Sequence, residues 1–349
     1  MNTKESILRR LRAAEDYLSG QQISRELGIS RAAVWKSIGK LKEEGYPIEA
    51  VTNKGYRLLS MDTEDTDLFN GAEITAHMHT FWAGHPLYFA AQTGSTNEDI
   101  LRLSGEGSPQ GTVAVTAVQT AGKGRRGRTW ISPDGNIYMS ILLKPHLPAP
   151  KAPMLTLVMA LSVLEAVRGL SSLGDSYAAA SSAAIKWPND IVMPGPDGQY
   201  RKICGILTEM RMEETEIRDI VIGIGINVNQ TEFPEEIRET ASSLRCLLGR
   251  IVNRSLLTAR VWERFEDNCN RFLEAESFTP LKERYEDALV NRGREVRVLD
   301  PRGPYTGTAL GINEDGALLV RLHGGEAEEG TVRAIDSGEV SVRGTGGYV

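Results

Sequence analysis

The feature that most restricts the fold of this chain is a helix, a tight glycine turn and a second helix within residues 20–44. Gly28 can close the first helix, because glycine adopts the left-handed conformation at a helix C′ position without strain. Ser30 is a favoured N-cap for the helix that follows. This spacing is typical of a helix-turn-helix, here at about residues 20–39.

Two short β segments follow these helices. Residues 48–52 and 55–59 are rich in strand-forming residues, and Asn53, Lys54 and Gly55 provide the turn between them. A helix-turn-helix followed by a hairpin predicts a winged helix over residues 1–62. The alternative is a small three-helix packing domain that binds a protein or has no partner.

A winged helix would present the start of its second helix to DNA bases and its wing to phosphates. Residues 1–60 carry eleven Lys or Arg against seven Asp or Glu, whereas the whole chain has a net charge of −6. A basic head on an acidic body indicates that a polyanion binds the head. The candidate DNA-binding residues are Gln21, Ser30, Arg31, Trp35, Lys36 and Lys54, with Lys40, Lys42 and Arg57 as further phosphate contacts.

Beyond an acidic segment at residues 61–70, apolar strand patterns alternate with helical patterns. This alternation predicts an α+β multidomain protein with a central mixed α/β domain. We expect a linker over 63–74, a central domain over 75–292 and a C-terminal domain over 293–349. The expected central strands are 87–91, 111–120, 136–143, 184–187, 202–210 and 217–227. The expected helices of the body are 97–104, 153–170, 256–275 and 280–291. In the head, a further helix is expected at 3–18, before the helix-turn-helix.

Composition restricts the compartment. The three cysteines, Cys204, Cys246 and Cys269, lie far apart without CxxC spacing, which argues against a disulfide framework and a structural zinc site. The first residues lack the apolar core of a secretory signal. No apolar run approaches the roughly 18 residues of a membrane span. We therefore expect a cytoplasmic protein with no membrane partner.

The sequence VQTAGKGRRGRTWI at residues 118–131 follows a predicted buried strand and carries four cations. Its glycines allow the backbone to turn sharply, and its cations can neutralise a phosphate or a carboxylate. A solvated basic hairpin tip is the simpler interpretation of this stretch alone.

Three polar clusters follow other predicted strands: residues 93–97, 186–190 and 223–229. Each has an ordinary structural explanation: helix capping, a Pro-Asn turn and a strand end, respectively. Several cations, one carboxylate and amide donors together suit a reaction that joins two anions, such as attack of a carboxylate on a nucleotide phosphate. The chain has no Walker, HExxH or GxSxG motif, which argues against a P-loop and against hydrolase chemistry.

These clusters resemble the motifs of biotin–protein ligases. The matching residues are Gly94–Asn97, Gln119, Gly122–Gly127, Lys186–Asp190, Lys202–Gly205 and Gly223–Asn227. With the winged helix in front, the chain is similar to the bifunctional ligases that also repress the biotin operon. The resemblance implies a class II synthetase-like catalytic domain, biotin and MgATP as substrates, a biotinyl-5′-AMP intermediate, and transfer to a lysine of a biotin carboxyl carrier domain.

The resemblance also assigns site residues. Ser95, Thr96, Asn97, Gln119, Lys123, Gly124, Arg125 and Lys202 would bind biotin, and Arg125, Trp130, Asn189 and Asn227 would bind the nucleotide. Arg125, Lys202 and Asp190 would carry the chemistry, and no residue is assigned as a metal ligand. Asp190 is open to three roles: base for the incoming lysine, Mg²⁺ ligand or orienting residue. Lys186 is the competitor of Lys202.

The family implies that the biotinyl-AMP-bound chain is a homodimer that binds operator DNA. Two other functions stay open: a ligand-responsive regulator without ligase activity, and a ligase for a related acyl group such as lipoate. Short strands at 295–299, 305–312, 317–322 and 339–343 predict an SH3-like β-barrel. That barrel would either cap the body or assist ATP or carrier binding.

Overall fold

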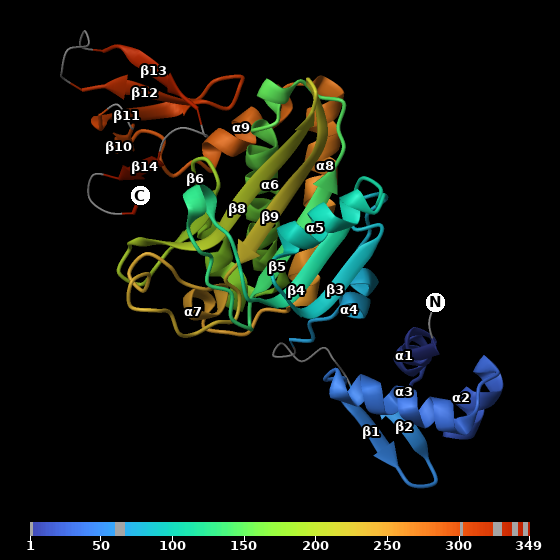
Figure 1. The fold of residues 1–349 in the computed structure, drawn as a ribbon. Helices are drawn as coiled ribbons and strands as arrows, with labels where there is room; N and C mark the ends of the chain where they lie inside the picture. The colour runs from blue at the N-terminus through green and yellow to red at the C-terminus, as the bar shows by residue number, and fades with distance from the viewer. Residues whose placement is uncertain (1–2, 60–66, 301–302, 324–329, 337–340, 345–347) are drawn as a thin grey trace.

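The computed structural model describes residues 3–59, 67–300, 303–323, 330–336, 341–344 and 348–349. Figure 1 shows a helical head with a small hairpin, a central body built on a large sheet, and a small sheet of short strands beside the body. These three parts follow one another along the chain. The three-part organisation agrees with the sequence interpretation.

The head contains the predicted helix-turn-helix. Gly28 has φ 65°, in the left-handed region, and the Ser30 side chain accepts a hydrogen bond from the Ala33 N–H at 3.1 Å. A small core of Ile7, Ile23 and Leu41 holds the helices together. The elements are α1 (Thr3–Ala13), α2 (Gly20–Leu27), α3 (Arg31–Glu43), β1 (Ile48–Val51) and β2 (Gly55–Leu58).

The first helix ends at Ala13, so the prediction that it continues to Leu18 was wrong. Leu18 instead forms an antiparallel bridge with Tyr56 of the hairpin. Gly55 makes this close approach possible, because a Cβ there would lie 2.2 Å from the Leu18 carbonyl oxygen. The two backbone hydrogen bonds between Leu18 and Tyr56 hold Leu18 in an extended conformation, although the spacing of the leucines favours a helix.

Helix α4 (Gly71–His77) connects head and body and begins within the segment expected to be a linker. The Tyr46 hydroxyl of the head donates to Glu73 Oε1 at 2.6 Å, and Arg12 of α1 forms an ion pair with the same carboxylate. Glu73 is buried, and its helix packs against α8 (Arg254–Ala275) of the body. The buried carboxylate of Glu73 therefore links α4 to both α1 and Tyr46 of the head.

The body is built on a seven-stranded sheet in the order β3-β4-β5-β9-β8-β7-β6. Only β3 and β4 run parallel; the other neighbours are antiparallel. Strand β7 was not expected, because Asp190 and Pro194 are poor strand residues, yet it pairs on both sides. The strands are β3 (Leu87–Thr93), β4 (Val113–Gln119), β5 (Ile137–Leu143), β6 (Ala184–Lys186), β7 (Asp190–Pro194), β8 (Tyr200–Glu213) and β9 (Glu216–Ile226).

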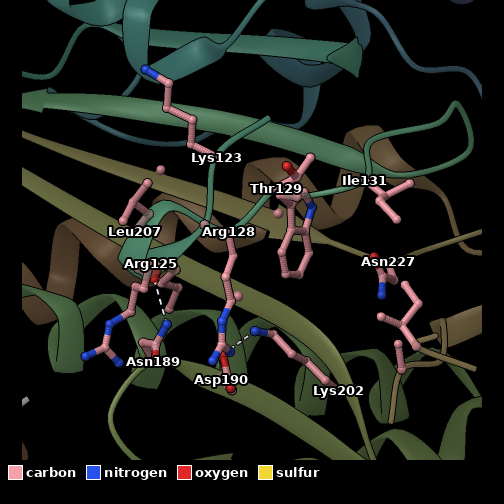
Figure 2. A pocket seen from close by; sticks show the side chains of 18 of the residues that line it. Lys123, Arg125, Arg128, Thr129, Ile131, Asn189, Asp190, Lys202, Leu207 and Asn227 are labelled. Carbon is pink, nitrogen blue, oxygen red and sulfur yellow. Dashed lines mark hydrogen bonds and ion pairs between the residues drawn. The ribbon is translucent and has the colours of Figure 1, made fainter. Parts of the chain in front are cut away.

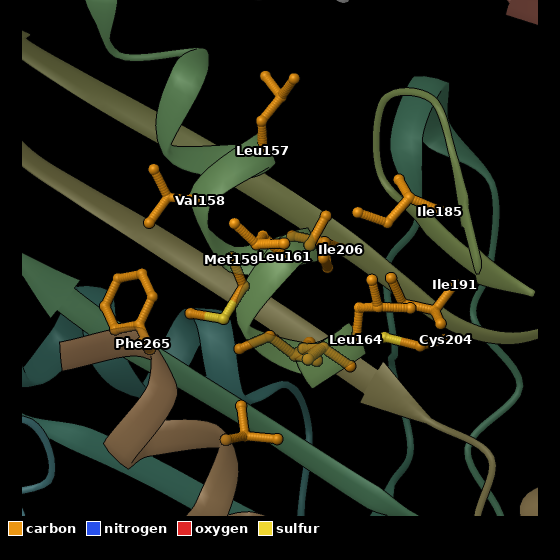
Figure 3. Close-up of a cluster of buried hydrophobic side chains, with 14 of the residues drawn as sticks. Leu157, Val158, Met159, Leu161, Leu164, Ile185, Ile191, Cys204, Ile206 and Phe265 are labelled. Carbon is orange, nitrogen blue, oxygen red and sulfur yellow. The ribbon is translucent and has the colours of Figure 1, made fainter. Parts of the chain in front are cut away.

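Helices cover both faces of this sheet. Ile100 and Leu103 of α5 (Thr96–Gly105) pack on one face, against Leu142 and Val221. Helix α6 (Met154–Arg168) and α8 pack on the other face, since alternate strand side chains point to opposite sides. Figure 3 shows α6 side chains together with Ile206 of β8 and Phe265 of α8.

The helical stretch Ala149–Leu173 is long and apolar enough to cross a membrane by length and composition alone. It includes α6, almost every residue of which is buried in the main core, so its apolar character is explained by packing. The remaining elements of the body are η1 (Arg125–Gly127), η2 (Ala149–Lys151), η3 (Gly169–Leu173), η4 (Asp175–Ser182), α7 (Leu244–Leu248) and α9 (Thr279–Asp287).

The C-terminal part forms a five-stranded antiparallel sheet in the order β13-β12-β11-β10-β14. Strand β13 was not expected, and residues 339 and 340 of the last expected strand lie outside the described residues. The strands are β10 (Glu295–Leu299), β11 (Tyr305–Ile312), β12 (Leu318–Leu322), β13 (Val332–Ile335) and β14 (Ser341–Gly344).

Candidate functional site

A cavity of about 450 Å³ opens beside the ends of β8 and β9 (Figure 2). Every residue predicted for substrate, nucleotide or catalysis lines it, although these residues come from six separate segments of the chain. They are Ser95, Thr96, Asn97, Gln119, Lys123, Gly124, Arg125, Trp130, Asn189, Asp190, Lys202 and Asn227. Lys186 is not among the lining residues.

Glycines make the floor of the cavity. Gly205 of β8 lies directly opposite Gly225 of β9, and Gly223 lies two residues earlier on the same face. A Cβ on Gly225 would lie 2.5 Å from the Trp130 indole nitrogen, and one on Gly223 would lie 2.1 Å from Asn97 Oδ1. A side chain at Gly223 or Gly225 would therefore collide with Asn97 or Trp130. These glycines are needed to make room for the cavity residues, so they are more than the end of a strand.

Buried polar groups from α5 and β5, together with the half-buried Gln119 of β4, form one wall. The Thr96 N–H donates to Gln119 Oε1 at 2.9 Å, and the Ser140 hydroxyl donates to Asn97 Oδ1 at 2.6 Å. Ser95 occupies the N-cap position of α5, but its side chain makes no capping hydrogen bond. Capping alone does not explain this cluster, and its donors and acceptors suit a polar ring such as a ureido group.

The basic loop at residues 122–131 is folded as a short hairpin over the cavity. The Gly124 N–H donates to the Arg128 carbonyl at 2.7 Å, and the Trp130 N–H donates to the Gly122 carbonyl at 2.9 Å. The Arg125 guanidinium donates to Asn189 Oδ1 at 2.8 Å (Figure 2), and burial lowers its pKa. The loop thus places Arg125 within the site.

Lys123 points away from Arg125 (Figure 2) and pairs with Glu98 of α5 at 2.6 Å. Both side chains are half-exposed, so this pair lies at the mouth of the cavity. Lys123 therefore lines the site without directing its ammonium to the interior in this structure.

Asp190 lies beside two lysines. Lys202 Nζ is 2.6 Å from Asp190 Oδ1, and Lys186 stands directly opposite Asp190 in the β6–β7 pair. Burial opposes ionisation of Asp190, but the charges of Lys202 and Lys186 and hydrogen bonds to its oxygens lower its pKa overall. Burial lowers the pKa of Lys186 to about 8. Of the two lysines only Lys202 reaches the cavity, which favours Lys202 for substrate contact.

Trp130 and Asn227 also line the cavity. The Lys202 ammonium is 5.0 Å from the centroid of the Trp130 ring, and the indole covers Gly225. The Asn227 side chain donates to the Ser242 carbonyl at 3.0 Å, so it also fixes the loop that follows β9. The side-chain amide of Asn227 therefore already makes one hydrogen bond within the protein.

Sequence reasoning missed part of the lining. The loop after β9 contributes Gln230, Phe233, Glu236, Ile237, Thr240 and Ala241, and the C-terminal part contributes Arg343 and Tyr348. The loop after β9 has no strand or helix pattern of its own, and Arg343 and Tyr348 lie far along the chain from the ligase motifs, so only the fold brings these segments to the site. Among the described residues, no group of three or more His, Cys, Asp or Glu could hold a metal ion.

The head presents the predicted DNA-binding residues on its surface. Trp35 on α3 is 73% exposed, and Gln21, Arg31, Lys36 and Lys54 are exposed as well. Ser30 is also exposed, but its side chain caps α3. Arg57 donates to Glu49 Oε2 at 3.1 Å, which leaves it less suited to a phosphate contact than Lys54.

Three regions of the chain match known families. Residues 3–57 match the HTH domain, residues 89–227 match the biotin/lipoate A/B protein ligase family, and residues 293–343 match the biotin protein ligase C terminal domain. The match covers all three parts of the fold.

Individual relatives span nearly the whole chain. The bifunctional ligase/repressor BirA of Bacillus spizizenii is 37% identical over 333 residues, which cover 95% of each chain. The protein of the same name from Escherichia coli is 30% identical over 345 residues, 98% of each chain. The structure of biotin protein ligase from Aquifex aeolicus in complex with biotin and ATP has a TM-score of 0.60 and 33% identity, and covers 74% of this chain and 99% of that one.

Proposed function

This chain belongs to the biotin–protein ligase family, and from that premise we propose that it activates biotin with ATP and transfers the biotinyl group to a carrier lysine. The observation that carries the proposal is the convergence of all twelve predicted ligase residues on one cavity. The helix-turn-helix head adds repression of biotin genes to the ligase activity.

In the first step the biotin carboxylate attacks the α-phosphorus of ATP, forming biotinyl-5′-AMP and releasing pyrophosphate. Both reactants are anions, so fixed cations lower the barrier by offsetting their repulsion and the charge that develops. Arg125 and Lys202 provide these cations within the cavity. Mg²⁺ would enter with the triphosphate as part of the substrate.

In the second step the carrier lysine amine attacks the biotinyl carbonyl, the C–O bond to AMP breaks, and the amine loses a proton. Asp190 is a weak base because its pKa is lowered and one of its oxygens is paired with Lys202. We therefore assign Asp190 the role of holding Lys202 toward the phosphate. A pH profile of transfer that Asp190→Asn leaves unchanged supports this assignment over a base role.

The polar wall formed by Ser95, Thr96, Asn97 and Gln119 would bind the ureido ring of biotin, and the loop from Lys123 to Arg125 would close over the adenylate. Trp130, Asn189 and Asn227 would contact the nucleotide. We assign the five-stranded C-terminal sheet to an SH3-like barrel. We divide the chain into a winged helix at 1–62, a linker at 63–74, a catalytic domain at 75–292 and a C-terminal domain at 293–349. The pairing of β10 with both β11 and β14 supports this barrel.

DNA binding would require the two-fold symmetry of a dimer on a palindromic operator. Biotinyl-AMP would stabilise the loop over the cavity and so favour the homodimer, which couples the ligand site to repression. The protein would act in the cytoplasm, where carrier domains and operator DNA are both accessible.

The test is incorporation of labelled biotin into a purified biotin carboxyl carrier domain with ATP. The proposal predicts stoichiometric labelling of the carrier domain that depends on ATP. Excess unlabelled lipoate should not reduce this labelling. Labelling with lipoate in place of biotin would identify the other acyl group of this fold. No labelling, with DNA binding retained, would identify a regulator without ligase activity.

A further inference from the structure

Tyr348 reaches the Asp190 carboxylate from the C-terminal part of the chain. Its hydroxyl donates to Asp190 Oδ2 at 2.6 Å, across 158 residues of chain. The other oxygen of the same carboxylate faces Lys202 Nζ at 2.6 Å. Each oxygen of Asp190 therefore has its own partner, and the two partners fix the plane of the carboxylate.

The aromatic ring of Tyr348 has a second contact. Lys186 Nζ lies 3.7 Å from the ring centroid, and Lys186 is only 5% exposed. A cation over an aromatic face is stabilised by the ring quadrupole, most strongly where water is excluded. The ring thus stabilises the charge of Lys186, while the hydroxyl of the same residue occupies Asp190 Oδ2.

Tyr348 is held in place by apolar packing. Tyr348 and Val349 pack against an apolar cluster formed by Ala184, Val192 and Val290. Tyr348 also lines the ligand cavity together with Arg343 of β14. The C-terminal sheet therefore contributes directly to the wall next to Asp190.

We propose that Tyr348 is a positioning residue for adenylation: its hydroxyl holds the Asp190 carboxylate so that Asp190 presents Lys202 to the phosphate. This inference rests on the proposed ligase function. Without the hydroxyl, Asp190 Oδ2 loses its donor and can turn toward Lys186, which draws the carboxylate away from Lys202.

The charged groups around this contact determine its pH dependence. Lys186 of β6, Lys202 of β8 and Arg125 of the basic loop face Asp190, and Arg343 of β14 and Arg128 face Tyr348. Burial, with the charge of Asp190, raises the pKa of Tyr348 well above its usual value, so the hydroxyl stays a donor. Its hydrogen bond helps to lower the pKa of Asp190, so its loss moves the Asp190 titration to higher pH.

The test compares Tyr348→Phe with wild type in the full-length protein. The phenylalanine ring keeps the contact with Lys186 and the apolar packing, and only the hydroxyl is lost. A hydrogen bond to a charged group is stronger than one between neutral groups, so we expect single-turnover adenylate formation to slow about tenfold or more. We also expect its acid limb to move to higher pH and biotin affinity to stay within about twofold of wild type.

The matched control is Tyr200→Phe, because Tyr200 lies in the same apolar cluster but has no contact with Asp190. Wild-type rate and pH profile in Tyr348→Phe would overturn the inference. Faster carrier labelling in Tyr348→Ala would also overturn it, since Tyr348 would then block the incoming lysine. A tenfold loss of rate without a shifted pH profile would also overturn the inference, because the hydroxyl would then act through the stability of the fold and not through Asp190.

Failure of the proposed function has a different signature. If wild type forms no adenylate from biotin and ATP, the ligase assignment fails, and the effect of Tyr348 is read from Asp190 itself. Carboxyl-carbon NMR of protein labelled at aspartate, with Asp190→Asn to assign the signal, follows that titration without any substrate. A titration unchanged by Tyr348→Phe would overturn the contact independently of activity.

Discussion

The head and the cavity place their functional residues in different ways. In the head, the residues expected to meet DNA lie between Gln21 and Lys54, on two helices and the hairpin that follows them. In the cavity, lining residues come from segments as far apart as Ser95 and Tyr348. Short-range spacing therefore predicts the head surface, whereas the cavity exists only once the whole body and the C-terminal sheet have folded.

The comparison predicts that single changes inside the cavity, away from its exposed mouth, have larger and more specific effects than single changes in the head. The largest effect is expected for Arg125→Ala, which removes a cation from the site of charge development. Loss of one such group costs roughly 10²–10³ in rate, and we expect that decrease in adenylate formation. Single-turnover formation of labelled biotinyl-AMP measures it.

The matched control is Arg102→Ala, because Arg102 is an exposed arginine of α5 that pairs with Glu106 and does not line the cavity. It should form adenylate at the wild-type rate. A normal rate in Arg125→Ala, with normal retention of the adenylate, would show that Arg125 is structural.

The glycine floor tests whether the cavity depends on empty backbone positions. In Gly223→Ala the new methyl group meets Asn97, which is buried and bonded to Ser140. Overpacking costs about 1–3 kcal/mol, so biotin affinity should fall by roughly 5- to 150-fold. Calorimetric titration with biotin measures the change.

Gly105→Ala is the control for this substitution, because nothing lies within 4 Å of a Cβ at Gly105. Its biotin affinity should equal that of wild type. Equal affinity in Gly223→Ala would mean that Asn97 can move without cost and that the floor glycine has no role in ligand binding.

In the head, Lys54→Ala should weaken DNA binding uniformly across sequences. Removal of one phosphate contact lowers the slope of log affinity against log salt by about 0.9. Arg31→Ala, at the start of α3, should cost about 1–3 kcal/mol and reduce sequence preference. Gel-shift titrations at several salt concentrations, with biotin and ATP present, separate the two effects.

Arg9→Ala serves as the head control, since Arg9 is exposed on α1 outside the helix-turn-helix. If both Lys54→Ala and Arg31→Ala bind DNA as Arg9→Ala does, the head is a packing domain rather than a DNA-binding domain.

The smallest effect is expected for Lys123→Ala, although this lysine belongs to the basic loop. Its ammonium pairs with Glu98 at the half-exposed mouth, and such pairs contribute about 0–1 kcal/mol. Biotin affinity should change by less than about fivefold. A larger loss would show that the loop turns Lys123 inward when biotin binds.

The same comparison explains what could be predicted from sequence. Gly28 and Ser30 predicted the turn of the head because capping is a local property. The twelve cavity residues were identified from motifs that resemble a family, and their convergence could not be derived from spacing. Strand β7 and the lining residue Tyr348 were missed because long-range pairing places them, against weak local preference.

One measurement tests most directly the claim that a single chain couples the cavity to the head. DNA binding is titrated with no ligand, with biotin alone, and with biotin plus ATP, using wild type and Arg125→Ala. The account predicts that only biotin plus ATP strengthens DNA binding by wild type, and that Arg125→Ala keeps the weaker, salt-dependent binding without this increase. Wild-type DNA affinity that is identical under all three conditions would contradict the coupling.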